Sequence, residues 1–340
     1  MSRTIRWEGG AVVTIDQRLL PSRYKVVRFR TSRQIVTALG NMTIRGAPLI
    51  GVASAYALAL EASKNKGRPK SQVLTRLRRA SKDLLSCRPT GRDMGKAIAR
   101  VLDRAESGEG ELSKGVISEA EEIADEYEAA ERKIVDIGQA VLKDGDVVLT
   151  HCNSGQLATV AWGTALGVII QAWKSGKRVS VIATETRPLL QGARLTAWEL
   201  EHDGIPFKLV TDSMVGYVMA RGLVSKVLVG ADRIWRDGSV ANKIGTLTIA
   251  TVAKDHGVPF YVVAPTSTFD LEGAPNYDVI ENRDPKEILH VGRVRIAPKG
   301  TQCLNPAFDI TTPDHITAIV TERGILRPPF EESIERSLAE

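Results

Sequence analysis

The sequence is poor in cysteine, in aromatic side chains and in long apolar runs. Its three cysteines, at positions 87, 152 and 303 of 340, form no CxxC pair. This spacing argues against a disulfide framework and against a cysteine zinc site. The longest weakly interrupted apolar stretches, Ala47 to Leu60 and Leu157 to Ile170, are shorter than the roughly 18 to 20 residues that cross a bilayer. We therefore expect no membrane partner.

Motifs for metals and nucleotides are also missing. The five histidines show no HxxxH or His-x-Glu grouping, and no acidic cluster resembles a magnesium or calcium loop. There is no Walker loop, and no GxGxxG follows an expected strand. We expect metal-independent chemistry without a cofactor, and a small anion such as a sugar phosphate as ligand.

The charge balance excludes little by itself. Lys and Arg number 46 against 40 Asp and Glu, a net charge of +6 with 5% aromatic residues. A nucleic-acid binder concentrates its positive charge beside exposed aromatics, whereas basic residues here are spread along the chain. The densest run, Arg76 to Arg79, alternates with apolar positions and is expected to be a solvated helix face. The charged N-terminus predicts no export signal, so we expect a cytoplasmic protein without a nucleic-acid partner.

The hydrophobic pattern changes near residue 144. A small β element over 6–27 precedes helical periodicity over 33–140, and after Asp144 strands alternate with helices. The expected strands are 147–150, 178–182, 207–210, 226–229 and 260–263, and the expected helices are 156–175, 192–203, 213–221 and 243–256. This alternation predicts a parallel sheet with right-handed crossovers. The fold class is therefore α/β, with an N-terminal β plus helical domain (1–140), a Rossmann-like doubly wound domain (141–340) and a site between the two.

Polar residues gather just past the expected strand ends, where such sheets bind ligands. The clusters are 150–155, 184–188, 230–233 and 265–268. Cys152 lies between a strand and a helix start, where free N–H groups can increase the thiolate fraction. Asp232 would be a carboxyl group at an apolar site entrance, where burial raises its pKa toward the range useful for proton transfer. Alternatively, it could cap the following segment or pair with Arg233. A pair of His151 with Cys152 is disfavoured, because neighbouring side chains on a strand alternate.

Three further segments have the parts of an anion site. They are Arg45-Gly46-Ala47-Pro48 before an apolar helix, Cys87-Arg88-Pro89-Thr90, and Asn242-Lys243-Ile244-Gly245-Thr246. Arginine offers a planar fork to phosphate, and backbone N–H groups at a helix start are further donors. Each arginine taken alone could equally be structural.

Seven motifs follow one another along the chain. They are residues 41–48 (NMTIRGAP), 150–153 (THCN), 185–196 (ETRPLLQGARLT), 230–234 (GADRI), 240–246 (VANKIGT), 264–270 (APTSTFD) and 305–309 (NPAFD). Together and in this order they resemble the methylthioribose-1-phosphate isomerase family. That family is similar to ribose-1,5-bisphosphate isomerase and to the regulatory α, β and δ subunits of initiation factor 2B.

The resemblance implies isomerisation of 5-methylthioribose 1-phosphate to 5-methylthioribulose 1-phosphate in methionine salvage. It implies Asp232 as the proton shuttle and Cys152 as the second catalytic group, and it leaves open whether hydrogen moves as a hydride or through an enolate. It also implies a homodimer. The implied substrate-binding residues are Arg45, Gly46, Ala47, Arg88, Gln191, Asn242 and Lys243.

The sequence departs from the family after Thr90. Arg92 and Lys96 occur where the family has apolar and aromatic residues. Another 5-substituted ribose 1-phosphate, such as ribose 1,5-bisphosphate or a 5-deoxy pentose, therefore stays open as substrate. A non-catalytic regulatory protein of the initiation factor 2B type is a further alternative, although such a protein would have no need of both Cys152 and Asp232.

Overall fold

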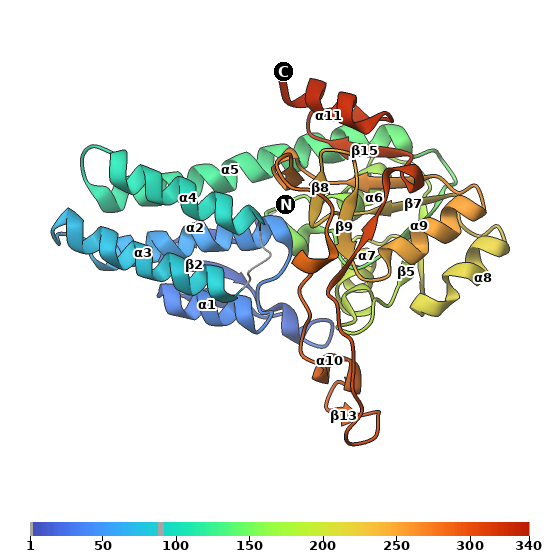
Figure 1. The fold of residues 1–340 in the computed structure, drawn as a ribbon, viewed down its shortest axis with the longest axis horizontal. Coiled ribbons are helices and arrows are strands. Elements are labelled where there is room, and N and C mark those ends of the chain that lie inside the picture. Colours follow the sequence, from blue (N-terminus) through green and yellow to red (C-terminus); the bar gives the residue numbers. More distant parts are fainter. Residues whose placement is uncertain (1–2, 88–91, 340) are drawn as a thin grey trace. The chain divides into compact units, whose positions relative to one another are not determined.

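The computed structural model describes residues 3–87 and 92–339 and divides the chain into two compact units. Unit 1 is Met1–Arg132 with Gln156–Gly163, and unit 2 is Lys133–Gly155 with Thr164–Glu340. Figure 1 shows the helices of unit 1 in blue to green and the sheet of unit 2 in green to red.

Unit 1 combines a small antiparallel sheet with a helical layer. The sheet has the order β1-β2-β3 and consists of β1 (Arg6–Glu8), β2 (Ala11–Ile15) and β3 (Val26–Phe29). The helices are α1 (Ser32–Gly40), α2 (Ala47–Lys64), α3 (Lys70–Cys87), α4 (Arg92–Ser107) and α5 (Leu112–Gly138). The Ala/Leu-rich α2 is buried on nearly all sides and packs against α1, α3 and α4, which is where a helix without a polar face must lie.

Unit 2 contains the doubly wound sheet that the strand–helix alternation predicts. The strand order is β16-β15-β10-β7-β4-β5-β6, and every neighbouring pair is parallel except β15 with β16. The strands are β4 (Val147–Thr150), β5 (Ser180–Thr184), β6 (Phe207–Val210), β7 (Lys226–Val229), β10 (Phe260–Val263), β15 (Ala318–Thr321) and β16 (Gly324–Leu326). The chain therefore winds outward from β4 in one direction through β5 and β6, and in the other through β7, β10 and β15. Its topological switch point lies between β4 and β7.

Alternate residues of these strands enter two separate hydrophobic cores. One core joins positions such as Leu149 and Val227 to helices α8 (Val215–Ala220), α9 (Thr246–Asp255) and α11 (Phe330–Ala339). The other joins Val148 and Leu228 to α6 (Ala165–Lys174) and α7 (Ala197–His202). Because successive side chains of a strand point to opposite faces, the two cores are the two covered faces of the sheet.

Several short elements were not expected from the sequence. A second sheet has the order β11-β8-β9-β14, with β8 (Arg233–Trp235), β9 (Val240–Lys243), β11 (Phe269–Asp270) and β14 (Phe308–Thr311). An arm made of α10 (Lys286–Leu289), β12 (His290–Val291) and β13 (Val294–Arg295) projects from unit 2 (Figure 1). The small sheet continues directly from the end of β7, so it shapes the loops beyond that strand.

Two expected helices are shorter than predicted. The helix expected over 156–175 is a single 3₁₀ turn at Gln156–Ala158, an irregular segment, and then α6 from Ala165. The backbone N–H groups of residues 160–162 bind the Glu131 carboxylate instead of helical carbonyls. The helix expected over 243–256 begins only at Thr246, because Lys243 ends strand β9.

Candidate active site

Cys152 lies two residues beyond the end of β4 and is half-buried. Its backbone has a positive φ of 60°, a conformation that costs a non-glycine residue about 1–3 kcal/mol. Both of its peptide groups are held: the N–H donates to Thr186 Oγ1 at 2.8 Å, and the carbonyl accepts from Thr196 Oγ1 at 2.6 Å. These two hydrogen bonds fix the main chain of Cys152, and with it the attachment point of the thiol, just beyond the carboxyl end of β4.

Asp232 lies three residues beyond the end of β7, the strand that pairs directly with β4. Its N–H donates to the Ala241 carbonyl at 3.0 Å, which anchors it beside β9, and the residue is half-buried. Neighbouring Arg233 forms an ion pair with Asp270 at 3.4 Å. Cys152 and Asp232 thus follow the two strands that flank the switch point, where doubly wound sheets bind ligands.

His151 is buried and uses both ring nitrogens within unit 2. Nδ1 lies 2.6 Å from Thr184 Oγ1, and Nε2 lies 2.9 Å from the Ile244 carbonyl oxygen. Burial lowers the pKa of this imidazole below its ordinary value, so the neutral ring is favoured. As expected from strand alternation, neither nitrogen remains for the thiol of Cys152.

Gln191 places an unsatisfied oxygen in the interior of unit 2. The side chain is 7% exposed, and its Oε1 is buried without a hydrogen-bond partner among the described residues. Gly192, which follows it, lies against β5: an added Cβ would be 1.7 Å from the Thr184 carbonyl oxygen. Only glycine fits there, so the segment that carries Gln191 lies directly on the end of β5.

Asn242 and Lys243 end strand β9. Asn242 is buried and donates from Nδ2 to Thr246 Oγ1 at 3.0 Å, and Lys243 Nζ donates to the Ala307 carbonyl at 2.9 Å. Asp309 accepts from the N–H groups of Gly245 (2.7 Å) and Leu247 (3.1 Å). Burial raises the pKa of Asp309 to about 6. These contacts fix the turn between β9 and α9.

In unit 1, Gly46 precedes the buried helix α2 with φ 103° and without a side-chain cap. A Cβ on Gly46 would lie 2.2 Å from the Ala158 carbonyl oxygen, so the loop 156–163 packs directly on the helix start. Half-buried Arg45 and Ala47 flank this glycine. An anion site at this helix start stays a prediction of the sequence. Arg88 lies outside the described residues.

Glu131 holds that loop from α5 and was missed by sequence reasoning. Its fully buried carboxylate accepts from the N–H groups of Val160 (2.8 Å), Ala161 (2.8 Å) and Trp162 (2.9 Å). Burial raises the pKa of Glu131 to about 7, although the three N–H donors oppose the rise. A lone glutamate in an acidic helix gave no signal in the sequence, because its partners are backbone groups 29 to 31 residues away.

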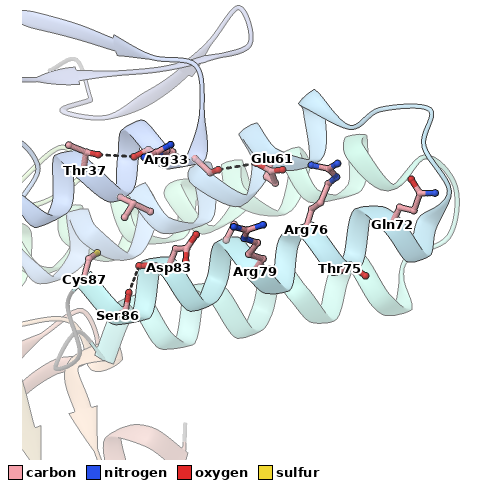
Figure 2. A pocket seen from close by; sticks show the side chains of 13 residues that line it. Arg33, Thr37, Glu61, Gln72, Thr75, Arg76, Arg79, Asp83, Ser86 and Cys87 are labelled. Carbon is pink, nitrogen blue, oxygen red and sulfur yellow. Dashed lines mark hydrogen bonds between the residues drawn. The ribbon is translucent and has the colours of Figure 1, made fainter.

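A polar groove also lies in unit 1, between α1 and α3 above α2 (Figure 2). Its volume is about 980 Å³, and Arg33, Arg76 and Arg79 line it together with Glu61 and Asp83. The predicted solvated face at Arg76–Arg79 is exposed, with Arg78 paired to Glu106 at 3.0 Å.

Two kinds of feature are absent from the described residues, namely membrane-spanning helices and metal-binding side-chain clusters. No helix within residues 3–87 and 92–339 is long and apolar enough to cross a membrane. In the same residues, no group of three or more His, Cys, Asp or Glu side chains could hold a metal ion.

Comparison with known proteins identifies the family to which the chain belongs. A methylthioribose-1-phosphate isomerase of Caldanaerobacter subterraneus is 45% identical, covering 98% of both chains. A 5-deoxyribose 1-phosphate isomerase of Moorella thermoacetica is 46% identical over 98% of this chain and 97% of its own. The solved structure of 5-methylthioribose 1-phosphate isomerase from Pyrococcus horikoshii has a TM-score of 0.92 and 40% identity, covering 100% of this chain and 96% of that one. The profile of the Initiation factor 2 subunit family matches residues 43–328, and the chain belongs to this family.

Proposed function

We propose that the protein is an aldose–ketose isomerase that converts 5-methylthioribose 1-phosphate to 5-methylthioribulose 1-phosphate in methionine salvage. The observation that carries the proposal is the placement of Cys152 and Asp232 after β4 and β7, the strands that flank the switch point. Near-full-length similarity to relatives named as isomerases supports the same reaction class.

The reaction needs a group that both gives and takes a proton. Because C1 carries the phosphate ester, the ring opens only when the C1–O4 bond breaks and O4 gains a proton. Hydrogen then moves from C2 to C1, and the C2 hydroxyl loses its proton as the ketone forms. One carboxyl group can supply the first proton and recover the second. We assign this shuttle to Asp232, and Cys152 is the second catalytic group at the reacting carbons.

The remaining predicted residues serve binding. Within unit 1, the proposal assigns phosphate binding to the N–H groups at Gly46 and Ala47 and to the guanidinium groups of Arg45 and Arg88. Within unit 2, it assigns substrate binding to Asn242 and Lys243 at the end of β9. The buried Oε1 of Gln191 accepts a hydrogen bond from a sugar hydroxyl, which satisfies an oxygen that has no partner within the described chain. We further propose that the protein acts as a cytoplasmic homodimer, which sedimentation of the purified chain would test.

A second candidate substrate is 5-deoxyribose 1-phosphate, because a relative of equal similarity carries that name. Ribose 1,5-bisphosphate is a weaker candidate. Its supposed 5-phosphate ligands are Arg92, which is half-buried, and Lys96, which is exposed on α4.

A regulatory, non-catalytic role is favoured by the family's own description and by the similarity to a solved structure described as the δ subunit of translation initiation factor eIF-2B from A. fulgidus, which is 45% identical with a TM-score of 0.89 over 100% of both chains. A binding protein has no use for a thiol and a carboxyl placed together at a switch point, so we rank this role below catalysis.

The deciding experiment offers the three sugar phosphates separately to the purified protein and follows ketose formation by NMR. We expect the highest kcat/KM with 5-methylthioribose 1-phosphate. A preference for the 5-deoxy sugar or the bisphosphate would change the assigned substrate, whereas absence of turnover with all three would favour the regulatory role.

A further inference from the structure

The proposed mechanism does not use His151, yet this residue belongs to a continuous hydrogen-bonded chain that begins at Cys152 and ends at Ile244. The Ile244 carbonyl can only accept, so His151 Nε2 carries the proton at 2.9 Å. In the neutral ring Nδ1 is then an acceptor, and the Thr184 hydroxyl donates to it at 2.6 Å.

The direction of the remaining bonds follows from these two. Thr184 Oγ1, having donated its hydrogen, can only accept from the Thr186 hydroxyl at 3.2 Å, and it lies closer to that hydroxyl than the other acceptor, the Thr184 carbonyl oxygen at 3.4 Å. Thr186 Oγ1 in turn accepts the Cys152 N–H at 2.8 Å. The four bonds therefore run in one direction from the Cys152 amide to the Ile244 carbonyl, an arrangement in which each bond polarises the next.

This hydrogen-bonded chain joins two parts of the candidate site. Cys152 follows β4, whereas Ile244 comes directly after Asn242 and Lys243 at the end of β9. Cys152 and Thr186 both have positive φ values, 60° and 62°, so local preference alone does not hold either residue in place. Gly245 lies against the imidazole, since a Cβ there would be 3.3 Å from two ring atoms.

We propose that His151, acting through Thr184 and Thr186, is a positioning residue that fixes the Cys152 main chain relative to the Asn242–Lys243 segment. The kinetic part of this inference rests on the proposed isomerase function. The structural part does not, because the orientation of the thiol affects its reactivity toward any reagent.

The test interrupts the hydrogen-bonded chain at Thr184 with a substitution that changes the shape of the side chain little. Thr184→Val removes the hydroxyl, and Thr184→Ser restores it. Thr321→Val is the matched control, because Thr321 is equally buried in the same sheet and its hydroxyl serves a local turn, donating to the Gly324 carbonyl and accepting from the Arg323 N–H. Each protein is assayed for kcat and KM, and for the alkylation rate of Cys152 by iodoacetamide across pH, read by peptide mass spectrometry. Cys87 and Cys303 serve as internal standards.

We expect Thr184→Val to lower kcat by about tenfold or more with a smaller change in KM, since small misplacements of a reacting group have large effects on rate. The alkylation profile of Cys152 should shift, those of Cys87 and Cys303 should not, and Thr184→Ser should recover both readouts. If Thr184→Val does not fold, His151→Asn replaces it, because the shorter amide can accept from Thr184 but cannot reach Ile244.

The inference is wrong if the variant that interrupts the hydrogen bonds, Thr184→Val or His151→Asn, keeps the wild-type kcat and Cys152 alkylation profile. It is also wrong if that variant changes them no more than Thr321→Val does. If the wild type turns over none of the sugar phosphates, the proposed function fails. The alkylation comparison then still decides the positioning role.

Discussion

Glu131 is the most direct place to test how the loop 156–163 is held. Its carboxylate is fully buried in unit 1 and accepts three backbone N–H groups from residues 160–162. Glu131→Gln keeps the shape and one acceptor oxygen but turns an N–H₂ group toward at least one of those donors. The substitution also removes the ionisation.

The magnitude follows from the raised pKa. Burial raises the pKa of Glu131 from 4.5 to about 7, so between these values the folded protein binds a proton that the unfolded chain does not. Stability from this group is therefore greatest at low pH and falls as pH rises through that window, by up to about 3 kcal/mol. In the glutamine variant the free energy of unfolding does not fall in this way, because residue 131 no longer ionises. The amide N–H₂ group that faces a backbone N–H lowers the free energy of unfolding by about 1–3 kcal/mol at every pH.

The assay is urea unfolding of both proteins at about pH 5 and about pH 8, compared as a difference so that other titrating groups cancel. We expect the variant to gain about 3 kcal/mol relative to wild type at the higher pH. Glu122→Gln, an exposed change on the same helix, should show no such gain. A difference that is independent of pH, or one in which wild type gains at high pH, would refute the reasoning.

Three further predictions concern unit 2. Gly192→Ala should lower the free energy of unfolding by about 3 kcal/mol or more, because its Cβ would overlap the Thr184 carbonyl oxygen, and thermal unfolding would show it. Gln191→Met should lower kcat/KM about tenfold while leaving stability equal or higher, since it removes a buried oxygen that has no hydrogen-bond partner in the described part of the chain; unchanged kinetics would contradict its binding role. Asp309→Asn should abolish a fall in stability as pH rises from 3.8 to about 6, measured by unfolding against pH.

The sequence predicted the doubly wound sheet because its strands are continuous apolar runs separated by helices. It did not predict the strand order, and the pairing of β4 with β7 is known only from the structure. The same pattern located Cys152 and Asp232 past strand ends. It also predicted that His151 faces away from the thiol, since neighbours on a strand alternate.

The features that the sequence did not predict depend on contacts and short elements that a local pattern does not record. The segment 159–164 is apolar enough for a helix, but Glu131 takes its backbone donors. The strands β8 and β11 are only three and two residues long and give no periodicity to detect. The contacts of His151 with Thr184 and Ile244 join residues 33 and 93 positions apart, which no local pattern records.

The central claim is that Cys152 and Asp232 act as a catalytic pair, and one measurement tests it most directly. Formation of 5-methylthioribulose 1-phosphate is followed with wild type, Cys152→Ser, Asp232→Asn and, as a folded control, Cys303→Ser. We predict that each of the first two variants loses about 10²-fold or more of kcat with unfolding midpoints close to wild type, while the control keeps full activity. Near-wild-type turnover by either Cys152→Ser or Asp232→Asn would contradict the account.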